Sequence, residues 1–89
     1  MVENYNLELS ERMIEKLEKL KKRDILRYKA VVSKILQIAK NPEIGKPLRG
    51  RFKGKRRVHV GSFVLIYRID EKNRRVTFLE FAHHDEAYK

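Results

Sequence analysis

The 89-residue sequence contains no cysteine and no long run of apolar residues. Without cysteine, a disulfide framework and a thiolate metal site are both excluded. No stretch of about 18 apolar residues exists, so the sequence predicts no transmembrane helix. The first residues also lack the basic-then-apolar pattern of a secretory signal, and low-complexity segments and internal repeats are absent. We therefore expect one cytoplasmic domain, spanning residues 1–89, that needs no cofactor.

Acidic residues are the scarcer charge, with 12 Asp and Glu against 22 Lys and Arg, and the net charge is +10. The excess is uneven: residues 1–44 carry a net charge of +3 and residues 45–89 a net charge of +7. The densest segment, residues 46–57, has seven Lys and Arg among twelve residues and no acid. Such a field attracts polyanions, so nucleic acid, an anionic membrane surface and an acidic protein are the candidate partners.

The first half of the chain predicts a strand followed by two helices. Apolar and polar residues alternate over residues 5–9, which is typical of a short, half-buried strand. An apolar stripe at helical spacing over residues 13–20 follows Ser10, whose hydroxyl can cap the first helical turn. A second stripe over residues 25–39 follows Asp24, a second candidate N-cap. The short joint between the stripes predicts an antiparallel helical hairpin.

The second half predicts strands. Residues 43–54 contain three of the four glycines and indicate an irregular connection. Gly61 and Ser62 suit a two-residue type II′ hairpin turn. Strands are predicted at 56–60, 63–69 and 76–81. Segregated helices and strands indicate an α+β fold, with the helical hairpin packed on one face of a sheet.

One part of the sequence resembles a known family. Pro47-Leu48-Arg49-Gly50, followed by the segment RVHVGSFVLIYRID over residues 57–70, resembles the heart of the RelE/ParE toxin superfamily. Members of that superfamily typically read LKG and then YRLRVGDYRIIYRID there. The ending His83-His84-xxx-Tyr88 is similar to the family's HRxxxY. The resemblance implies a RelE-like fold: an N-terminal strand, a helical hairpin, and a three-strand antiparallel meander in one curved sheet.

The resemblance also implies a function. RelE-type toxins of type II toxin–antitoxin systems bind the ribosomal A site and cleave mRNA by attack of the ribose 2′-OH, leaving a 2′,3′-cyclic phosphate. A RelB-like antitoxin wraps such a toxin and silences it, and no membrane is involved. Two alternatives stay open. ParE-type members share the fold but inhibit DNA gyrase, and a basic RNA-binding module without activity would have the same charge.

RNA cleavage of this kind needs a base, an acid, and stabilisation of the charge on the phosphate. Arg57 and His59 are two residues apart on a predicted strand, so they face the same way. They fall where the family carries a catalytic basic pair, which makes His59 the candidate base and Arg57 the phosphate ligand. The alternative is a solvated strand face. His84 is the candidate acid and Tyr88 the candidate base-stacking residue, unless they are an ordinary polar tail and a cover for the sheet.

Further cations are candidates for binding the RNA backbone, although a charged run is often only a solvated loop. These RNA-binding candidates are Lys46, Arg49, Arg51, Lys53, Lys55, Arg56 and Arg68. Tyr67 is expected to pack in the core. Because adjacent side chains share neither a helix face nor a strand face, we expect no metal site from His83 and His84. The chain departs from the family pattern at Val64 and His84, where RelE-type toxins usually carry arginine.

Overall fold

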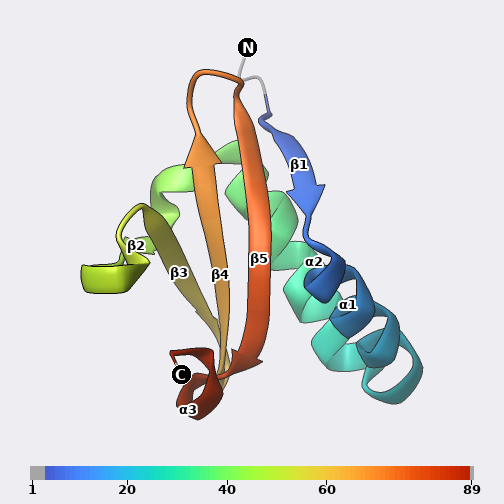
Figure 1. Cartoon of the computed structure of the whole chain (residues 1–89). Coiled ribbons are helices and arrows are strands. Elements are labelled where there is room, and N and C mark those ends of the chain that lie inside the picture. Colours follow the sequence, from blue (N-terminus) through green and yellow to red (C-terminus); the bar gives the residue numbers. More distant parts are fainter. Residues whose placement is uncertain (1–3, 89) are drawn as a thin grey trace.

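The structure, a computed structural model, describes residues 4–88. Its five strands form one sheet in the order β1-β5-β4-β3-β2, and two long helices cover one face of that sheet (Figure 1). A short third helix lies at the C-terminal end of the chain. The predicted α+β arrangement of a strand, a helical hairpin and an antiparallel meander is confirmed.

The helical hairpin consists of α1 (Glu11–Arg23) and α2 (Ile25–Lys40). Ser10 caps α1, because its Oγ accepts a hydrogen bond from the backbone N–H of Met13 at 3.1 Å. Asp24 ends α1 and begins α2: its N–H donates to Leu20 O at 2.7 Å, and its Oδ1 accepts from Arg27 N at 3.1 Å. One residue therefore satisfies orphan backbone groups of both helices, which makes the joint short.

The sheet is built around β4 (Phe63–Asp70) and β5 (Arg75–His83), which pair antiparallel. β3 (Lys55–Val60) pairs antiparallel with β4, and β1 (Asn6–Leu9) adds to the other edge parallel to β5. Gly61 has a φ of +62° at the β3–β4 turn, as the predicted type II′ turn requires.

The sequence missed three features of the second half. The predicted irregular connection contains a two-residue strand, β2 (Lys46–Pro47), between the 3-10 turns Pro42–Ile44 and Gly50–Phe52. β5 continues two residues beyond the predicted end, and the tail forms the short helix α3 (His84–Ala87). No helix in the described part of the chain is long and apolar enough to cross a membrane.

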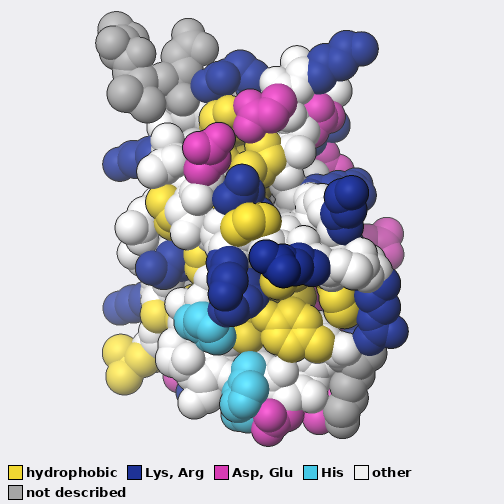
Figure 2. All heavy atoms as spheres, turned by 90° about the vertical axis from the view of Figure 1, so that its left-hand side faces the viewer, with side chains coloured by type: hydrophobic (Ala, Val, Ile, Leu, Met, Phe, Trp, Pro, Cys, Tyr) yellow, Lys and Arg dark blue, Asp and Glu magenta, His cyan; other side chains and the backbone are white. Residues whose placement is uncertain are grey.

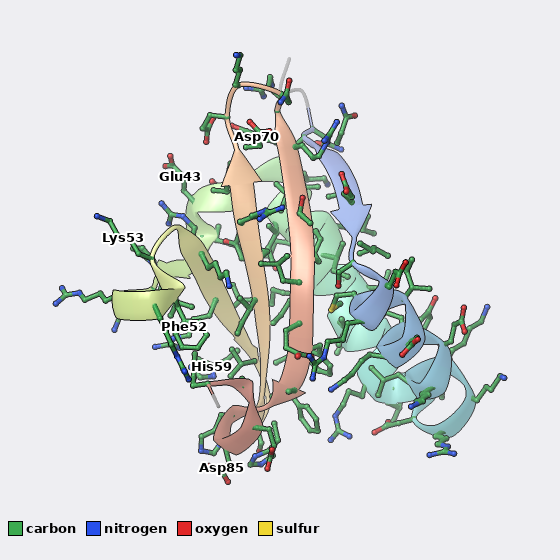
Figure 3. All side chains as sticks on the ribbon, viewed as in Figure 1. Glu43, Phe52, Lys53, His59, Asp70 and Asp85 are labelled. Carbon is green, nitrogen blue, oxygen red and sulfur yellow. The ribbon has the colours of Figure 1, made fainter. Side chains whose placement is uncertain are left out.

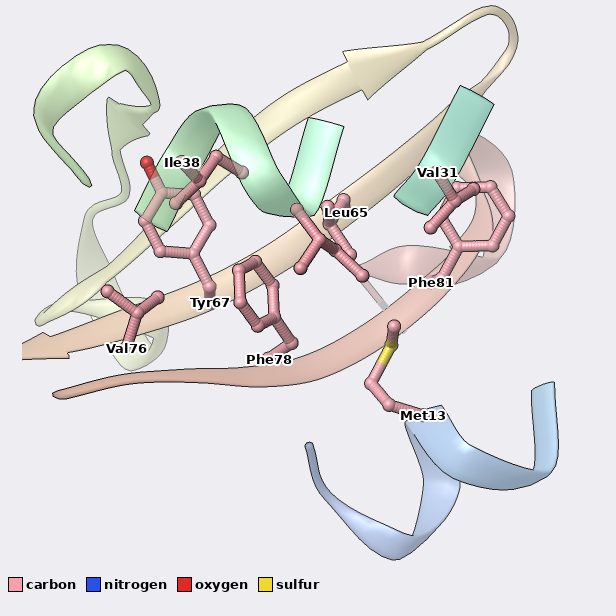
Figure 4. Close-up of a cluster of buried hydrophobic side chains, with 9 residues drawn as sticks. Met13, Val31, Ile38, Leu65, Tyr67, Val76, Phe78 and Phe81 are labelled. Atoms are coloured by element: carbon pink, nitrogen blue, oxygen red, sulfur yellow. The ribbon is translucent and has the colours of Figure 1, made fainter. Parts of the chain in front are cut away.

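The main core lies between the hairpin and the sheet. Met13, Val31 and Ile38 from the helices pack against aromatic and aliphatic side chains of the central strands (Figure 4). Tyr67 is fully buried there, as expected for a packing residue. Its hydroxyl donates to Pro42 O at 2.6 Å and accepts from Gly45 N at 2.9 Å. Tyr67 therefore fixes the segment that leads into β2.

A second, smaller cluster lies on the opposite face of the sheet. Val64, Ile66 and Ala82 of the central strands pack there against Ala87 of α3, with Tyr88 at its side. The helical hairpin does not cover this face, because α1 and α2 pack on the other one. Along β3 and β4, every second side chain points into the main core. The side chains between them therefore point to this open face.

Candidate nucleic-acid interface

The open face of β3 carries the predicted catalytic pair. Val58 and Val60 pack against the main core, so the alternating residues Lys55, Arg57 and His59 project to the opposite side. The Arg57 guanidinium contacts Nε2 of His59. The spacing of these two residues predicted that they would face the same way, and this is confirmed.

Neighbouring strands add further cations to the same face. Lys46 on β2 lies directly opposite Arg57, and Arg68 on β4 lies directly opposite Lys55. Residues directly opposite one another in a sheet share a face. We call Lys46, Lys55, Arg57, His59 and Arg68 the cationic face. Figure 2, which views the molecule from the β2–β3 side, shows Lys and Arg side chains gathered over this edge with the histidines below them.

The cationic face is not balanced by acids. Within residues 4–88, no Asp or Glu forms an ion pair with any of its members. Glu80, the acid on the adjacent part of β5, is held instead by Arg12 at 2.8 Å and Lys16 at 3.5 Å. Like charges directly opposite in a sheet destabilise it, so this arrangement costs folding free energy. A surface of this kind suits a polyanionic ligand.

The C-terminal tail reaches the same end of the sheet. His84 N donates to Ser62 O at 3.0 Å, which holds the start of α3 against the β3–β4 turn, three residues after His59. Arg51 Nη2 donates to Tyr88 O at 2.7 Å, and the rings of Phe52 and Tyr88 meet edge to face at 5.7 Å. Figure 3 shows Phe52, His59 and Asp85 at this end of the molecule. The loop before β3 and the tail therefore meet beside the cationic face.

A shallow cleft of about 240 Å³ lies between these segments. Phe52, Ile66, Leu79 and Ala87 give it an apolar lining, and its charged edges are Arg12, Lys55 and Glu80. The Lys55 ammonium lies 5.6 Å from the centre of the Phe52 ring, within cation–π range. The apolar lining could receive a stacked base, and Lys55 is the cation at its edge that could bind the phosphate, since Arg12 is paired with Glu80.

Tyr88 packs on the sheet face beside this cleft. Its ring lies against the second cluster, and its hydroxyl is buried without a hydrogen-bond partner among the described residues. Buried tyrosine hydroxyls usually find a partner, so this position leaves one polar group unsatisfied. Val64, where the family usually has arginine, is fully buried in the same cluster.

Four predicted RNA-binding residues lie outside the cationic face, and one of them, Arg51, is bound to the tail at Tyr88 O. Arg56 points to the other side of β3, where its guanidinium donates to Gly45 O at 2.8 Å and to Glu43 O at 3.3 Å. Arg56 therefore helps to hold the connection after α2. Arg49 and Lys53 are exposed on the loop between β2 and β3, and Lys53 extends away from the sheet (Figure 3).

The sequence reasoning missed two residues at this site. Phe52 forms one wall of the cleft, and an aromatic residue inside a basic run was a usable signal. Asp85 lies with Oδ1 2.9 Å from Nε2 of His84 and Oδ2 3.5 Å from Nδ1 of His83. Although His83 and His84 share neither a strand face nor a helix face, their ring centroids are 4.7 Å apart, because the chain turns from β5 into α3 between them.

Comparison with known proteins identifies the family. The family model described as the ParE toxin of the type II toxin–antitoxin system, parDE, matches residues 7–88. The chain belongs to this toxin family. A curated relative from Methanocaldococcus jannaschii named "Putative toxin RelE4" is 41% identical over 96% of this chain and 92% of its own length. The predicted membership of the RelE/ParE superfamily is thereby confirmed.

Solved structures agree with this family assignment. The toxin–antitoxin complex RelBE2 from Mycobacterium tuberculosis contains a chain that matches with a TM-score of 0.80 and 27% identity, over 92% of this toxin and 100% of that chain. The YoeB/ParE toxin from Agrobacterium tumefaciens matches with a TM-score of 0.81 over 89% of this toxin and 98% of that chain. Its identity is only 17%, so this second match speaks for the fold alone.

Proposed function

We propose that this toxin is a ribosome-dependent mRNA endonuclease. The observation that carries the proposal is the cationic face, on which Arg57 and His59 are in contact and form no ion pair with any Asp or Glu of residues 4–88. Phosphoryl transfer to a 2′-OH places growing negative charge on the phosphate oxygens, and a cluster of uncompensated cations stabilises that charge. A guanidinium can also bind two of those oxygens at once.

The proposed reaction assigns one step to each side chain. His59 accepts the proton of the ribose 2′-OH, and the 2′-oxygen attacks the scissile phosphorus. Arg57 binds the phosphate oxygens while the bond to the 5′-oxygen breaks. His84 donates a proton to that leaving oxygen, which yields a 2′,3′-cyclic phosphate and a 5′-OH. Neither a metal nor a cofactor takes part in this scheme.

Binding of the RNA is assigned to the surroundings of this centre. Tyr88 and Phe52 supply aromatic rings that can stack on an unpaired base, which contributes roughly 1–3 kcal/mol per base. The proposed backbone contacts in mRNA and in ribosomal RNA at the A site come from Lys46, Arg49, Arg51, Lys53, Lys55 and Arg68. Arg56 is left out of this set, because its guanidinium is bound to Gly45 O and Glu43 O on the other side of β3. Because translated mRNA is the substrate, we assign the activity to the cytoplasm.

We further propose that a cognate, RelB-like antitoxin covers the cationic face. The matched mycobacterial chain was solved as a toxin–antitoxin complex. An acidic or amphipathic segment of the antitoxin would pair with the cations that bind the RNA when the antitoxin is absent. Co-expression with the product of the adjacent reading frame should yield a complex and restore growth. The absence of both complex and rescue would refute this partner.

Gyrase inhibition is the second candidate function. The matching family model is that of ParE toxins, and Val64 and His84 stand where RelE-type toxins usually carry arginine. Induced expression followed by primer extension on translated transcripts separates the candidates. Cuts that depend on translation support the endonuclease. A DNA-damage response with intact messages would support gyrase inhibition instead, and normal growth would indicate a binding module without activity.

A further inference from the structure

The turn from β5 into α3 gathers three potential metal ligands. The ligand atoms of His83, His84 and Asp85 all lie within 4.8 Å of one another. The Asp85 carboxylate lies between the imidazoles, with one oxygen 2.9 Å from His84 Nε2 and the other 3.5 Å from His83 Nδ1. Among residues 4–88, no other group of three such side chains brings its ligand atoms as close together.

The donor set defines the kind of ion. Two imidazole nitrogens and one carboxylate oxygen suit Zn²⁺ and its neighbours in the first transition row, whereas Mg²⁺ and Ca²⁺ prefer all-oxygen sites. The same set of two histidines and one carboxylate occurs in zinc sites that leave the fourth position open. Such a site takes water or an anionic oxygen as its fourth ligand.

The local structure allows the three side chains to close on an ion. His84 and Asp85 are exposed and His83 is partly exposed, so an ion can enter from solvent. Typical Zn–N and Zn–O distances are about 2.0–2.2 Å, so small rotations of the side chains complete the site. His83 Nδ1 would give up its bond from Asp85 N, which is long at 3.3 Å. Asp85 also offsets part of the charge of the ion in a protein of net charge +10.

We infer that His83, His84 and Asp85 form a binding site for a zinc-type divalent ion beside the β3–β4 turn. The ion would occupy the lone pair of His84. This consequence rests on the proposed function, in which His84 donates a proton to the leaving oxygen. A bound ion therefore removes the proton donor and slows RNA cleavage.

The test is a Zn²⁺ titration of the full-length toxin, followed through the NMR signals of its three histidine side chains. At one equivalent of Zn²⁺, the signals of His83 and His84 should shift while those of His59 stay in place. His83→Asn should weaken Zn²⁺ binding by about tenfold or more, measured by competition with a chromogenic chelator. Asn still caps a helix, so this variant keeps the start of α3.

Asp85→Asn is the second variant, and His59→Asn is the matched control because it removes the histidine that is not among the three proposed ligands. Asp85→Asn should bind Zn²⁺ more weakly than the parent, and the control should bind as tightly as the parent. The inference is overturned if His59 shifts together with the other two histidines, or if His83→Asn and Asp85→Asn both bind as tightly as the parent.

A cleavage assay tests the consequence separately. Zn²⁺ should slow cleavage by the parent toxin and leave the rate of His83→Asn unchanged. If the metal-free parent cuts no RNA, the proposed function fails, while the binding measurements still decide whether the site exists. If Zn²⁺ binds as expected and cleavage is not slowed, the inhibitory consequence is refuted.

Discussion

At the scale of single residues, Arg57 combines a cost to folding with a gain in function. Arg57 lies opposite Lys46, and the two like charges repel each other. It also contacts His59, where its guanidinium could bind the phosphate of the RNA. We expect Arg57→Ala to lower cleavage about 100-fold or more while the free energy of unfolding stays unchanged or rises slightly. Cleavage on ribosomes and urea unfolding measure the two effects.

Arg75→Ala is the control for Arg57→Ala, because Arg75 on β5 pairs with Glu8 at 3.4 Å, away from the cationic face. It should leave cleavage unchanged. Full toxicity of a well-expressed Arg57→Ala variant would remove Arg57 from the mechanism, and a large loss of stability would make it a structural residue.

Tyr67 is structural, and its hydroxyl gives a second prediction. Tyr67→Phe leaves Gly45 N–H and Pro42 O without their buried partner, so the free energy of unfolding should fall by roughly 1–3 kcal/mol at neutral pH. Partly exposed Tyr28 supplies the control, because Tyr28→Phe should change stability much less. Urea unfolding at pH 7 checks both variants.

The same variant has a predicted pH dependence. Burial raises the pKa of Tyr67 above its ordinary value, and the hydrogen bond from Gly45 only partly opposes this. The stabilisation is therefore complete below the unfolded pKa of about 10 and is lost as the pH rises through the folded pKa. The stability gap between the parent and Tyr67→Phe should narrow above pH 10. A constant gap in alkaline urea titrations would contradict this assignment.

At the scale of elements, the features encoded by neighbours in sequence were predictable. The two helices were anticipated together with their caps, because Ser10 and Asp24 act within three residues of the N–H groups they bind. The β3–β4 turn was anticipated because a positive φ at Gly61 is a local requirement. These local signals do not depend on contacts with distant parts of the chain.

The elements that were not predicted from the sequence depend on contacts with residues far away along the chain. β2 is two residues long and is defined by its pairing with β3, and Tyr67 holds the segment before it. α3 begins at His84, whose backbone N–H donates a hydrogen bond to Ser62 O in the β3–β4 turn. A register shift between Ile66 and Tyr67 changes the pairing of β4 with β5, which no local pattern indicates. The shared orientation of Arg57 and His59 was predictable from their spacing, whereas the contact of Phe52 with Tyr88 and the position of Asp85 beside the two histidines depend on how the tail folds.

The turn between β4 and β5 gives a prediction at this scale. Asp70 accepts hydrogen bonds from Asn73 Nδ2 at 2.8 Å and from Asn73 N at 3.2 Å, and these bonds hold the pKa of its carboxyl below the ordinary value. The stabilisation is thus present above the unfolded pKa of about 3.9 and is lost as the pH falls through the folded pKa. Asp70→Ala should therefore lower the melting temperature at pH 7.

The effect of Asp70→Ala should disappear in strong acid, where the parent's carboxyl is protonated as well. Lys72→Ala, an exposed change in the same turn, is the control and should have little effect at either pH. Thermal unfolding at several pH values measures both. A melting-temperature difference that persists in strong acid would show that Asp70 acts through packing instead of its charge.

At the scale of the whole molecule, the uneven charge should appear in the salt dependence of RNA binding. Each contact with a phosphate of single-stranded RNA contributes about 0.7 to the slope of log affinity against log salt. Lys46→Gln and Arg68→Gln should each reduce that slope by about this amount. Lys22→Gln, an exposed change on α1, should leave it unchanged. Equal effects of all three would mean that net charge alone drives binding.

The most direct measurement of the central claim is an NMR titration with a short RNA that lacks the 2′-OH at the cleavage position. If the cationic face and the tail form one anion-binding site, amide signals of residues 50–59 and 84–88 should shift together with a single dissociation constant. Signals on the exposed sides of α1 and α2 should not move. Two different affinities for the two segments, or shifts confined to the helical hairpin, would contradict the account.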